Sequence, residues 1–268
     1  YPMDAGVPGH EGWGRVCSLG SAVTRVRCGA RVGMLSQHAF AEFDVVDENL
    51  VVELPESLHG KPFPAEPLGC ALNVFRRANI SRGQTVAIVG IGFLGAIVLR
   101  LAVLAGARVI AITRRPESLD LVKRYGAHEC IQMSDHWEII ERVKLLTAGR
   151  FCDVVVEATG HQWPLDLSAE ITAERGRMVV AGYHQGGPRR VNMQLWNWRG
   201  LDVINAHERD PAVYLQGMQS AVELVASGDL NPELLYTHCY PLERIGDAFG
   251  TATGRPEGFM KALVMFQS

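Results

Sequence analysis

Short apolar runs rich in valine and isoleucine recur through the middle of the chain and alternate with stretches of helical spacing. The runs lie at 86–89, 108–112, 129–131, 152–160, 176–182 and 201–205. Each is short enough to be a buried strand, and the segments between them are long enough for crossover helices. The pattern predicts an α/β fold, with a doubly wound parallel sheet and right-handed crossovers.

The two ends of the chain have a different pattern. Glycine and proline punctuate short candidate strands at 14–16, 30–32, 41–46 and 50–54, which predicts a β-rich, barrel-like unit. A proline-rich linker and a helix at 68–78 follow, and a helix at 211–228 precedes a short β-rich tail. We therefore expect three segments, with bounds 1–70, 71–210 and 211–268.

Composition narrows the class of protein. The chain has 268 residues, of which 47% are apolar and 21% charged, and its net charge is −3. A balance of this kind is typical of a soluble globular protein and indicates neither nucleic acid nor membrane as a partner. The six cysteines are scattered and form no C-x-x-C, so we interpret them as free buried thiols in a reducing, cytoplasmic compartment.

The first central run ends in a complete G-x-G-x-x-G, which lies between a predicted strand and a predicted helix. Gly90 suits the tight turn, Gly92 allows a pyrophosphate to approach the backbone, and Gly95 allows close packing of helix and strand. The helix N-terminus, at Phe93 and Leu94, offers unpaired N–H groups to phosphates. In this context the motif predicts a dinucleotide site, whereas a bare glycine-rich turn would be weak evidence.

The residues after the second central run indicate which dinucleotide is bound. An acidic residue there would accept hydrogen bonds from the ribose 2′-OH of NAD(H). This chain has Thr113, Arg114 and Arg115 instead. Two guanidinium groups can pair with a 2′-phosphate, so we expect NADP(H) to be favoured over NAD(H). The alternative is that the two arginines form a solvated turn.

A histidine and a glutamate stand side by side near the start of the chain, as His10 and Glu11 between glycines. Such a pair can place an imidazole and a carboxylate at one metal ion. The motif is weak on spacing alone, since His10 could equally be a hydrogen-bonded strand residue.

Several motifs together resemble the medium-chain dehydrogenase/reductase family. They are Gly9-His10-Glu11, Glu66-Pro67-Leu68, the glycine motif at 90–95, the run 153–160 and the tail 237–243. The likeness is to its zinc-type polyol (sorbitol) dehydrogenase-like and bacteriochlorophyllide dehydrogenase-like branch, and it covers nearly the whole chain. It implies a GroES-like catalytic domain formed by the two ends of the chain, a Rossmann domain between them, and an active site in the intervening cleft.

The resemblance also implies a catalytic zinc. His10 would be a ligand, Glu11 a ligand or close neighbour, and Glu66 the later carboxylate of the polyol dehydrogenases. Cys70 is interpreted as a buried thiol. The implied reaction is hydride transfer between the nicotinamide and an alcohol, polyol or carbonyl carbon, with zinc as a Lewis acid on the substrate oxygen.

The chain departs from the family pattern in two places. The lobe with four clustered cysteines for a structural zinc is absent between Leu35 and Ala41. The family's first catalytic cysteine lies upstream of the G-H-E motif, and only nine residues precede His10. We therefore expect these 268 residues to bind zinc weakly, and an upstream segment to supply the missing ligand.

Four small residues end strands at the carboxyl edge of the predicted sheet and are expected to contact the cofactor: Ala158, Thr159, Ala181 and Gly182. His161 and His184 lie near the same edge and are interpreted as solvent-facing loop residues, with substrate contact as the alternative. The strand at 201–205 should be the sheet's last, and the resemblance implies a homodimer paired along it. The alternatives to the alcohol or polyol dehydrogenase are a zinc-free quinone or enone reductase and a non-catalytic dinucleotide-binding remnant.

Overall fold

The computed structural model describes residues 9–266, which divide into two compact units. One unit contains the chain up to Leu72 and again from Glu208 onward, and the other is Asn73–His207. The units divide at 72/73 and 207/208, and the bounds expected from the sequence are 70/71 and 210/211. No helix within residues 9–266 combines the length and apolar character needed to cross a lipid bilayer.

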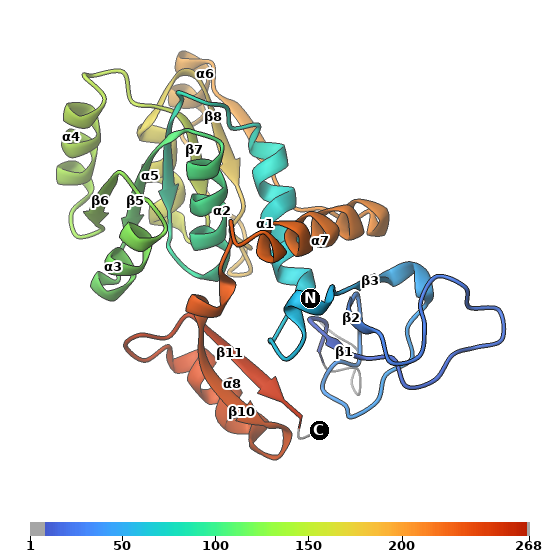
Figure 1. The fold of residues 1–268 in the computed structure, drawn as a ribbon. Coiled ribbons are helices and arrows are strands. Elements are labelled where there is room, and N and C mark those ends of the chain that lie inside the picture. Colours follow the sequence, from blue (N-terminus) through green and yellow to red (C-terminus); the bar gives the residue numbers. More distant parts are fainter. Residues whose placement is uncertain (1–8, 267–268) are drawn as a thin grey trace. The chain divides into compact units, whose positions relative to one another are not determined.

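The second unit contains a six-stranded parallel sheet with the order β6-β5-β4-β7-β8-β9 (Figure 1). Its strands are β4 (Thr85–Val89), β5 (Arg108–Thr113), β6 (Glu129–Gln132), β7 (Cys152–Glu157), β8 (Thr172–Val180) and β9 (Asp202–Asn205). The first three strands in sequence extend outward from β4, and the next three extend from β7 in the other direction. The order therefore reverses between β4 and β7, as it does in the doubly wound dinucleotide-binding fold.

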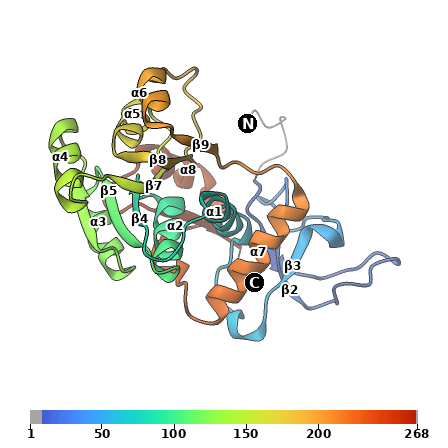
Figure 2. The same ribbon diagram turned by 90° about the horizontal axis from the view of Figure 1, so that it is seen from above.

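Helices cover both faces of this sheet (Figure 2). One face carries α2 (Phe93–Leu104) and α3 (Pro116–Arg124), and the other carries α4 (His136–Leu146), α5 (Gln162–Glu170) and α6 (Met193–Arg199). Successive strand residues face opposite sides, so both faces must be apolar. Val86, Ala87, Ile88 and Val89 are accordingly all 0% exposed.

The first unit contains two small sheets. An antiparallel sheet consists of β1 (Trp13–Arg15), β2 (Arg31–Met34) and β3 (Val51–Glu53), and a parallel pair consists of β10 (Tyr236–Pro241) and β11 (Lys261–Met265). The helix α8 (Ile245–Gly254) connects that pair. Short 3₁₀ helices lie at Glu48–Leu50, Glu56–Leu58, Pro232–Leu235 and Leu242–Arg244. Within residues 9–266 the three antiparallel strands form an open sheet and do not close the expected barrel.

Two glycines fix the start of α1 (Ala65–Ala78), the helix that carries Glu66. A Cβ on Gly33 of β2 would lie 2.3 Å from the Cβ of Ala65. A Cβ on Gly69 would lie 2.8 Å from Met218 of α7 (Pro211–Ala226). The helix therefore packs in direct backbone contact with β2 on one side and α7 on the other, which sets the position of its first turn.

The expected strand at 41–46 is wrong, since these residues form an irregular loop. The side chain of Asp44 folds back onto Ser36 and His38, and the carboxylate is 3.8 Å from the His38 ring. The apolar members of the pattern consequently point outward, with Phe43 75% and Val45 97% exposed. The alternation of polar and apolar residues reflects this local polar contact and not a strand with one buried face.

Candidate cofactor and metal sites

The glycine motif forms a tight turn between β4 and α2. Gly90 has φ +102°, and a Cβ there would lie 2.4 Å from the side chain of Thr159. A Cβ on Gly95 would lie 2.0 Å from the Gly90 carbonyl oxygen. Gly92 is the N-cap of α2 with no side-chain cap, and nothing lies within 4 Å of its missing Cβ. Two glycines are thus required for packing, while the third leaves the helix N-terminus open to a ligand.

This turn lies at the point where the strand order reverses. Gly90 follows β4, and Ala158 and Thr159 follow the neighbouring strand β7. The carboxyl ends of adjacent parallel strands at such a switch point are where open α/β sheets bind ligands. The close approach of Gly90 to Thr159 shows that the two turns meet there.

Thr113, which ends β5, and the two arginines that follow it differ in exposure. Thr113 is only 3% exposed, and its hydroxyl accepts a hydrogen bond from the Arg115 N–H (3.3 Å). Arg115 is partly buried, and Arg114 is exposed. Of the residues considered for a 2′-phosphate, Arg114 therefore presents the accessible guanidinium, and Thr113 shapes the turn.

Ala181 and Gly182 follow β8 and pack against the turn after β7. Both of their N–H groups donate to the Glu157 carbonyl at 2.8 Å. A Cβ on Gly182 would lie 2.2 Å from the Gly160 nitrogen. The two loops are therefore in backbone contact, and all four of the small residues expected near the cofactor lie partly exposed at this edge.

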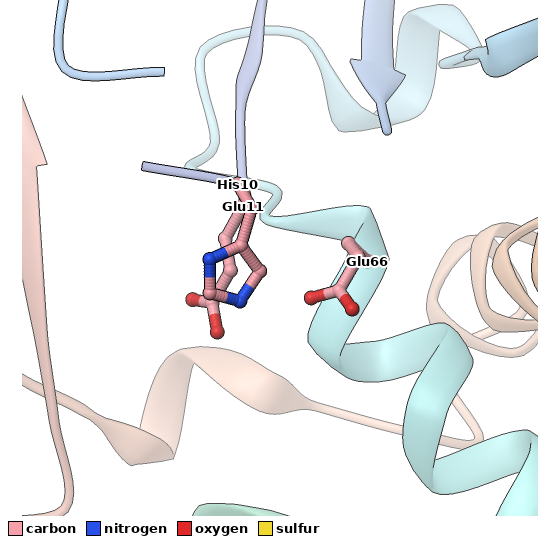
Figure 3. A group of neighbouring side chains, drawn as sticks. All are labelled: His10, Glu11 and Glu66. Carbon is pink, nitrogen blue, oxygen red and sulfur yellow. The ribbon is translucent and has the colours of Figure 1, made fainter. Parts of the chain in front are cut away.

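The first unit brings His10, Glu11 and Glu66 together. One ligand atom from each lies within 4.8 Å of the others, and Figure 3 shows the three side chains directed to a common space. Gly9 has φ +92°, His10 lies in a bend, and β1 begins only at Trp13. The pair therefore avoids the extended geometry that would direct adjacent side chains to opposite faces.

Competing neighbours act on the Glu66 carboxyl in this cluster. Burial raises the pKa of the Glu66 carboxyl, and the nearby negative charge of Glu11 raises it further. A hydrogen bond from Cys70 and the positive charges of His10 and Lys261 act in the opposite direction. Two carboxylates and an imidazole that converge in this way can serve as oxygen and nitrogen ligands for a divalent metal.

Two neighbours complete the cluster. Lys261 of β11 pairs with the Glu11 carboxylate. Cys70, one helical turn after Glu66, donates from its thiol to Glu66 Oε1 at 3.1 Å. Burial and the adjacent Glu66 charge both raise the pKa of the Cys70 thiol, which keeps it protonated as a donor. Cys70 thus contacts a candidate ligand, in addition to the packing role expected for it.

The structure corrects two further expectations. His161 is exposed as expected, but His184 is not solvent-facing: its side chain is 16% exposed and its Nε2 lies 3.0 Å from Glu157. The six cysteines are free, yet Cys17, Cys28 and Cys239 are exposed and not buried. The local sequence around these four residues does not distinguish a buried side chain from an exposed one.

The comparisons with known proteins agree with the fold. The sequence profile of the zinc-binding dehydrogenase family matches residues 94–225. The quinone oxidoreductase of Pseudomonas aeruginosa is 30% identical over 87% of this chain and 75% of its own length. The sorbitol dehydrogenase of Gallus gallus is 27% identical over 95% of this chain and 79% of its own length.

A structural comparison gives the same result. A Sinorhizobium meliloti 1021 structure described as a zinc-binding dehydrogenase bound to NADP has a TM-score of 0.83 and is 26% identical, covering 96% of this chain and 82% of the other. The chain belongs to the medium-chain dehydrogenase/reductase family. For two other curated relatives, the chain spans only about half of the relative's own length, 56% in one case and 54% in the other.

Proposed function

We propose that the protein transfers a hydride between NADP(H) and a small alcohol, polyol or carbonyl compound, assisted by zinc where an upstream segment supplies the further metal ligand. The observation that carries the proposal is the convergence of His10, Glu11 and Glu66 in a chain that also has the open glycine turn. The turn supports dinucleotide binding, and the cluster supports metal-assisted rather than metal-free chemistry.

His10 and Glu66 are the protein ligands we assign to the metal, with Glu11 as a third ligand or close neighbour. This donor set fits zinc, which accepts imidazole nitrogen and carboxylate oxygen in catalytic sites with three protein ligands. The metal, when bound, supplies Lewis-acid activation of the substrate oxygen. Two neighbouring residues set the charge balance of the candidate metal ligands. Lys261 offsets the charge of Glu11, and Cys70 donates a hydrogen bond to Glu66.

The preference for NADP(H) rests on Arg114. Its exposed guanidinium follows β5, where the adenosine ribose is bound in this fold, and no carboxylate stands in the sequence 113–115. A guanidinium can pair with a 2′-phosphate through two parallel hydrogen bonds. The small residues after β7 and β8 leave the backbone accessible to the other half of the cofactor.

A zinc-free quinone or enone reductase is the second candidate. It is favoured by the similarity to the Pseudomonas aeruginosa quinone oxidoreductase and by the Lys261–Glu11 pair, which already neutralises one candidate ligand. A non-catalytic dinucleotide-binding protein would retain the glycine turn but convert neither class of substrate.

A substrate panel separates these candidates. Purified protein that carries the upstream segment is incubated with NADP⁺ and NAD⁺ against polyols and secondary alcohols, and with NADPH against quinones and enones. The proposal predicts oxidation of at least one alcohol or polyol, with NADP⁺ the better acceptor. Reduction of quinones alone would support the second candidate, and cofactor binding without turnover of any compound would support the third.

A further inference from the structure

A buried carboxylate at the carboxyl edge of the second unit joins two loops. Glu157, the last residue of β7, is 0% exposed. Its Oε1 accepts hydrogen bonds from the N–H groups of Thr159 (2.7 Å) and Gly160 (2.9 Å), and also contacts the Thr159 hydroxyl. Its Oε2 lies 3.0 Å from Nε2 of His184, in the loop after β8. One side chain therefore binds both loops, and a buried carboxylate requires such partners.

The partners of His184 define its tautomer. Arg189 Nε donates to His184 Nδ1 at 3.0 Å. A guanidinium only donates, so Nδ1 is the acceptor and the ring proton lies on Nε2, where it is donated to Glu157. His184 thus connects a buried negative charge to a guanidinium through two hydrogen bonds.

Arg189 closes the network back onto the first loop. Its terminal nitrogens donate to the Gly160 carbonyl at 2.9 Å and to the Gly187 carbonyl at 3.1 Å. The backbones also touch, because a Cβ on Gly160 would lie 2.6 Å from the Tyr183 carbonyl oxygen. Side-chain hydrogen bonds and backbone contact together hold the two loops in one arrangement.

The position of these loops indicates what they serve. In the observed strand order the glycine turn after β4 suits the pyrophosphate, and the end of β5 suits the adenosine ribose. The strands β7 and β8 belong to the other mononucleotide half of the sheet. Their loops carry Thr159 and Gly182, which are partly exposed at the same edge.

We propose that Glu157, His184 and Arg189 are positioning residues that hold the loops after β7 and β8 in the arrangement that receives the nicotinamide half of the cofactor. This inference rests on the proposed dinucleotide binding and deepens it. The three residues act through the loops and are not assigned a contact with the reacting atoms.

The test compares a whole dinucleotide with its adenosine half. Dissociation constants of NADP⁺ and of adenosine 2′,5′-bisphosphate are measured by calorimetry for the wild type, His184→Ala and Arg189→Gln. If the wild type prefers NAD⁺, the two ligands compared are NAD⁺ and ADP. Arg190→Gln is the matched control, because it removes the same charge from the exposed neighbouring residue. Thermal unfolding is recorded for every variant.

We expect His184→Ala and Arg189→Gln to weaken dinucleotide binding by about tenfold, the effect of losing roughly one hydrogen bond to a charged group. Binding of the adenosine half should be unchanged, as should both affinities of Arg190→Gln. Equal losses for both ligands would indicate a general structural effect and overturn the inference, and so would unchanged dinucleotide binding. A wild type that binds the adenosine half and no dinucleotide would overturn the proposed function together with the inference.

Discussion

The ammonium group of Lys261 pairs with the carboxylate of Glu11, although 250 positions separate the two residues in the sequence. Lys261 begins β11, near the end of the chain, and Glu11 belongs to the candidate metal cluster near its start. The pair shows that the last strand contributes to the charge balance of the cluster, and that Glu11 has a partner before any metal is considered.

Removal of the Lys261 charge should strengthen metal binding. Lys261 competes with a cation for Glu11, and its positive charge opposes the approach of a second one. We expect Lys261→Met to raise zinc affinity by about tenfold, the scale of one charge-assisted hydrogen bond. Zinc affinity is measured by competition with a chromophoric chelator. Lys61→Met is the control, since it breaks the exposed Lys61–Glu233 pair. Weaker zinc binding in Lys261→Met would instead show that the lysine orients Glu11 as a ligand.

Arg114 should decide the choice of dinucleotide. Arg114→Ala removes the exposed guanidinium after β5 and should lower NADPH affinity by about tenfold or more, with NADH affinity unchanged. Fluorescence titration of both cofactors measures this, with Arg150→Ala as an exposed control. Equal affinities of the wild type for the two cofactors would refute the assignment.

The edge strand β9 should mediate a homodimer. It is the last strand in the sheet order, and an uncovered edge strand has unpaired N–H and C=O groups. We expect light scattering to give a dimer at micromolar concentration. Along an edge strand, the N–H groups point alternately toward the neighbouring strand and toward the open edge. Val203→Pro and Ile204→Pro are therefore compared, since only one of them removes an N–H group at the open edge.

The proline that blocks the outward N–H should yield a folded monomer, as judged by circular dichroism. Val45→Pro, at an exposed valine outside the strands, should leave the dimer intact. A monomeric wild type would rule out the edge-paired dimer.

Cys152 should make stability fall at alkaline pH. Burial, and then the nearby Asp153, raise its pKa from an ordinary 9.0 to about 12. Between these two values the unfolded chain has lost the thiol proton while the folded chain retains it, so the free energy of unfolding decreases as pH rises. Below pH 9.0 the contribution is fully present.

Urea unfolding across this range measures the effect. In Cys152→Ala the free energy of unfolding should fall less steeply with pH than in the wild type. In Cys239→Ala, which removes an exposed thiol, it should fall as in the wild type. Identical slopes for the wild type and Cys152→Ala would show that other groups cause the alkaline loss.

The sequence predicts the central sheet well because its strands are buried on both faces. Runs such as Val86–Val89 must be continuously apolar there, and glycines such as Gly90 and Gly95 are required wherever a Cβ would collide. These constraints are local, so a single segment reveals them. The loop at 41–46 shows the limit, because its alternation resembles a strand while Asp44 folds back on its own neighbours.

Long-range polar contacts were the part that the sequence could not supply. Neither Lys261 nor His184 lies in a pattern that names its partner, and residues distant in sequence meet only once the fold is known. Glu157 gives a partial signal. A carboxylate that closes an apolar strand must be paired when buried, so a search for histidine or arginine partners is justified from sequence alone.

A single assay distinguishes zinc-assisted hydride transfer at His10 and Glu66 from a metal-free reaction. Reduction of NADP⁺ by the best alcohol or polyol substrate is followed in the near-ultraviolet for the wild type, His10→Ala and the control His38→Ala, each before and after dialysis against a chelator and after restoration of zinc. In protein that carries an upstream segment with the further metal ligand, we expect activity in the wild type and His38→Ala that the chelator abolishes and zinc restores, and none in His10→Ala, although His10→Ala still binds NADPH. Chelator-resistant turnover, or full activity in His10→Ala, would contradict zinc-assisted transfer.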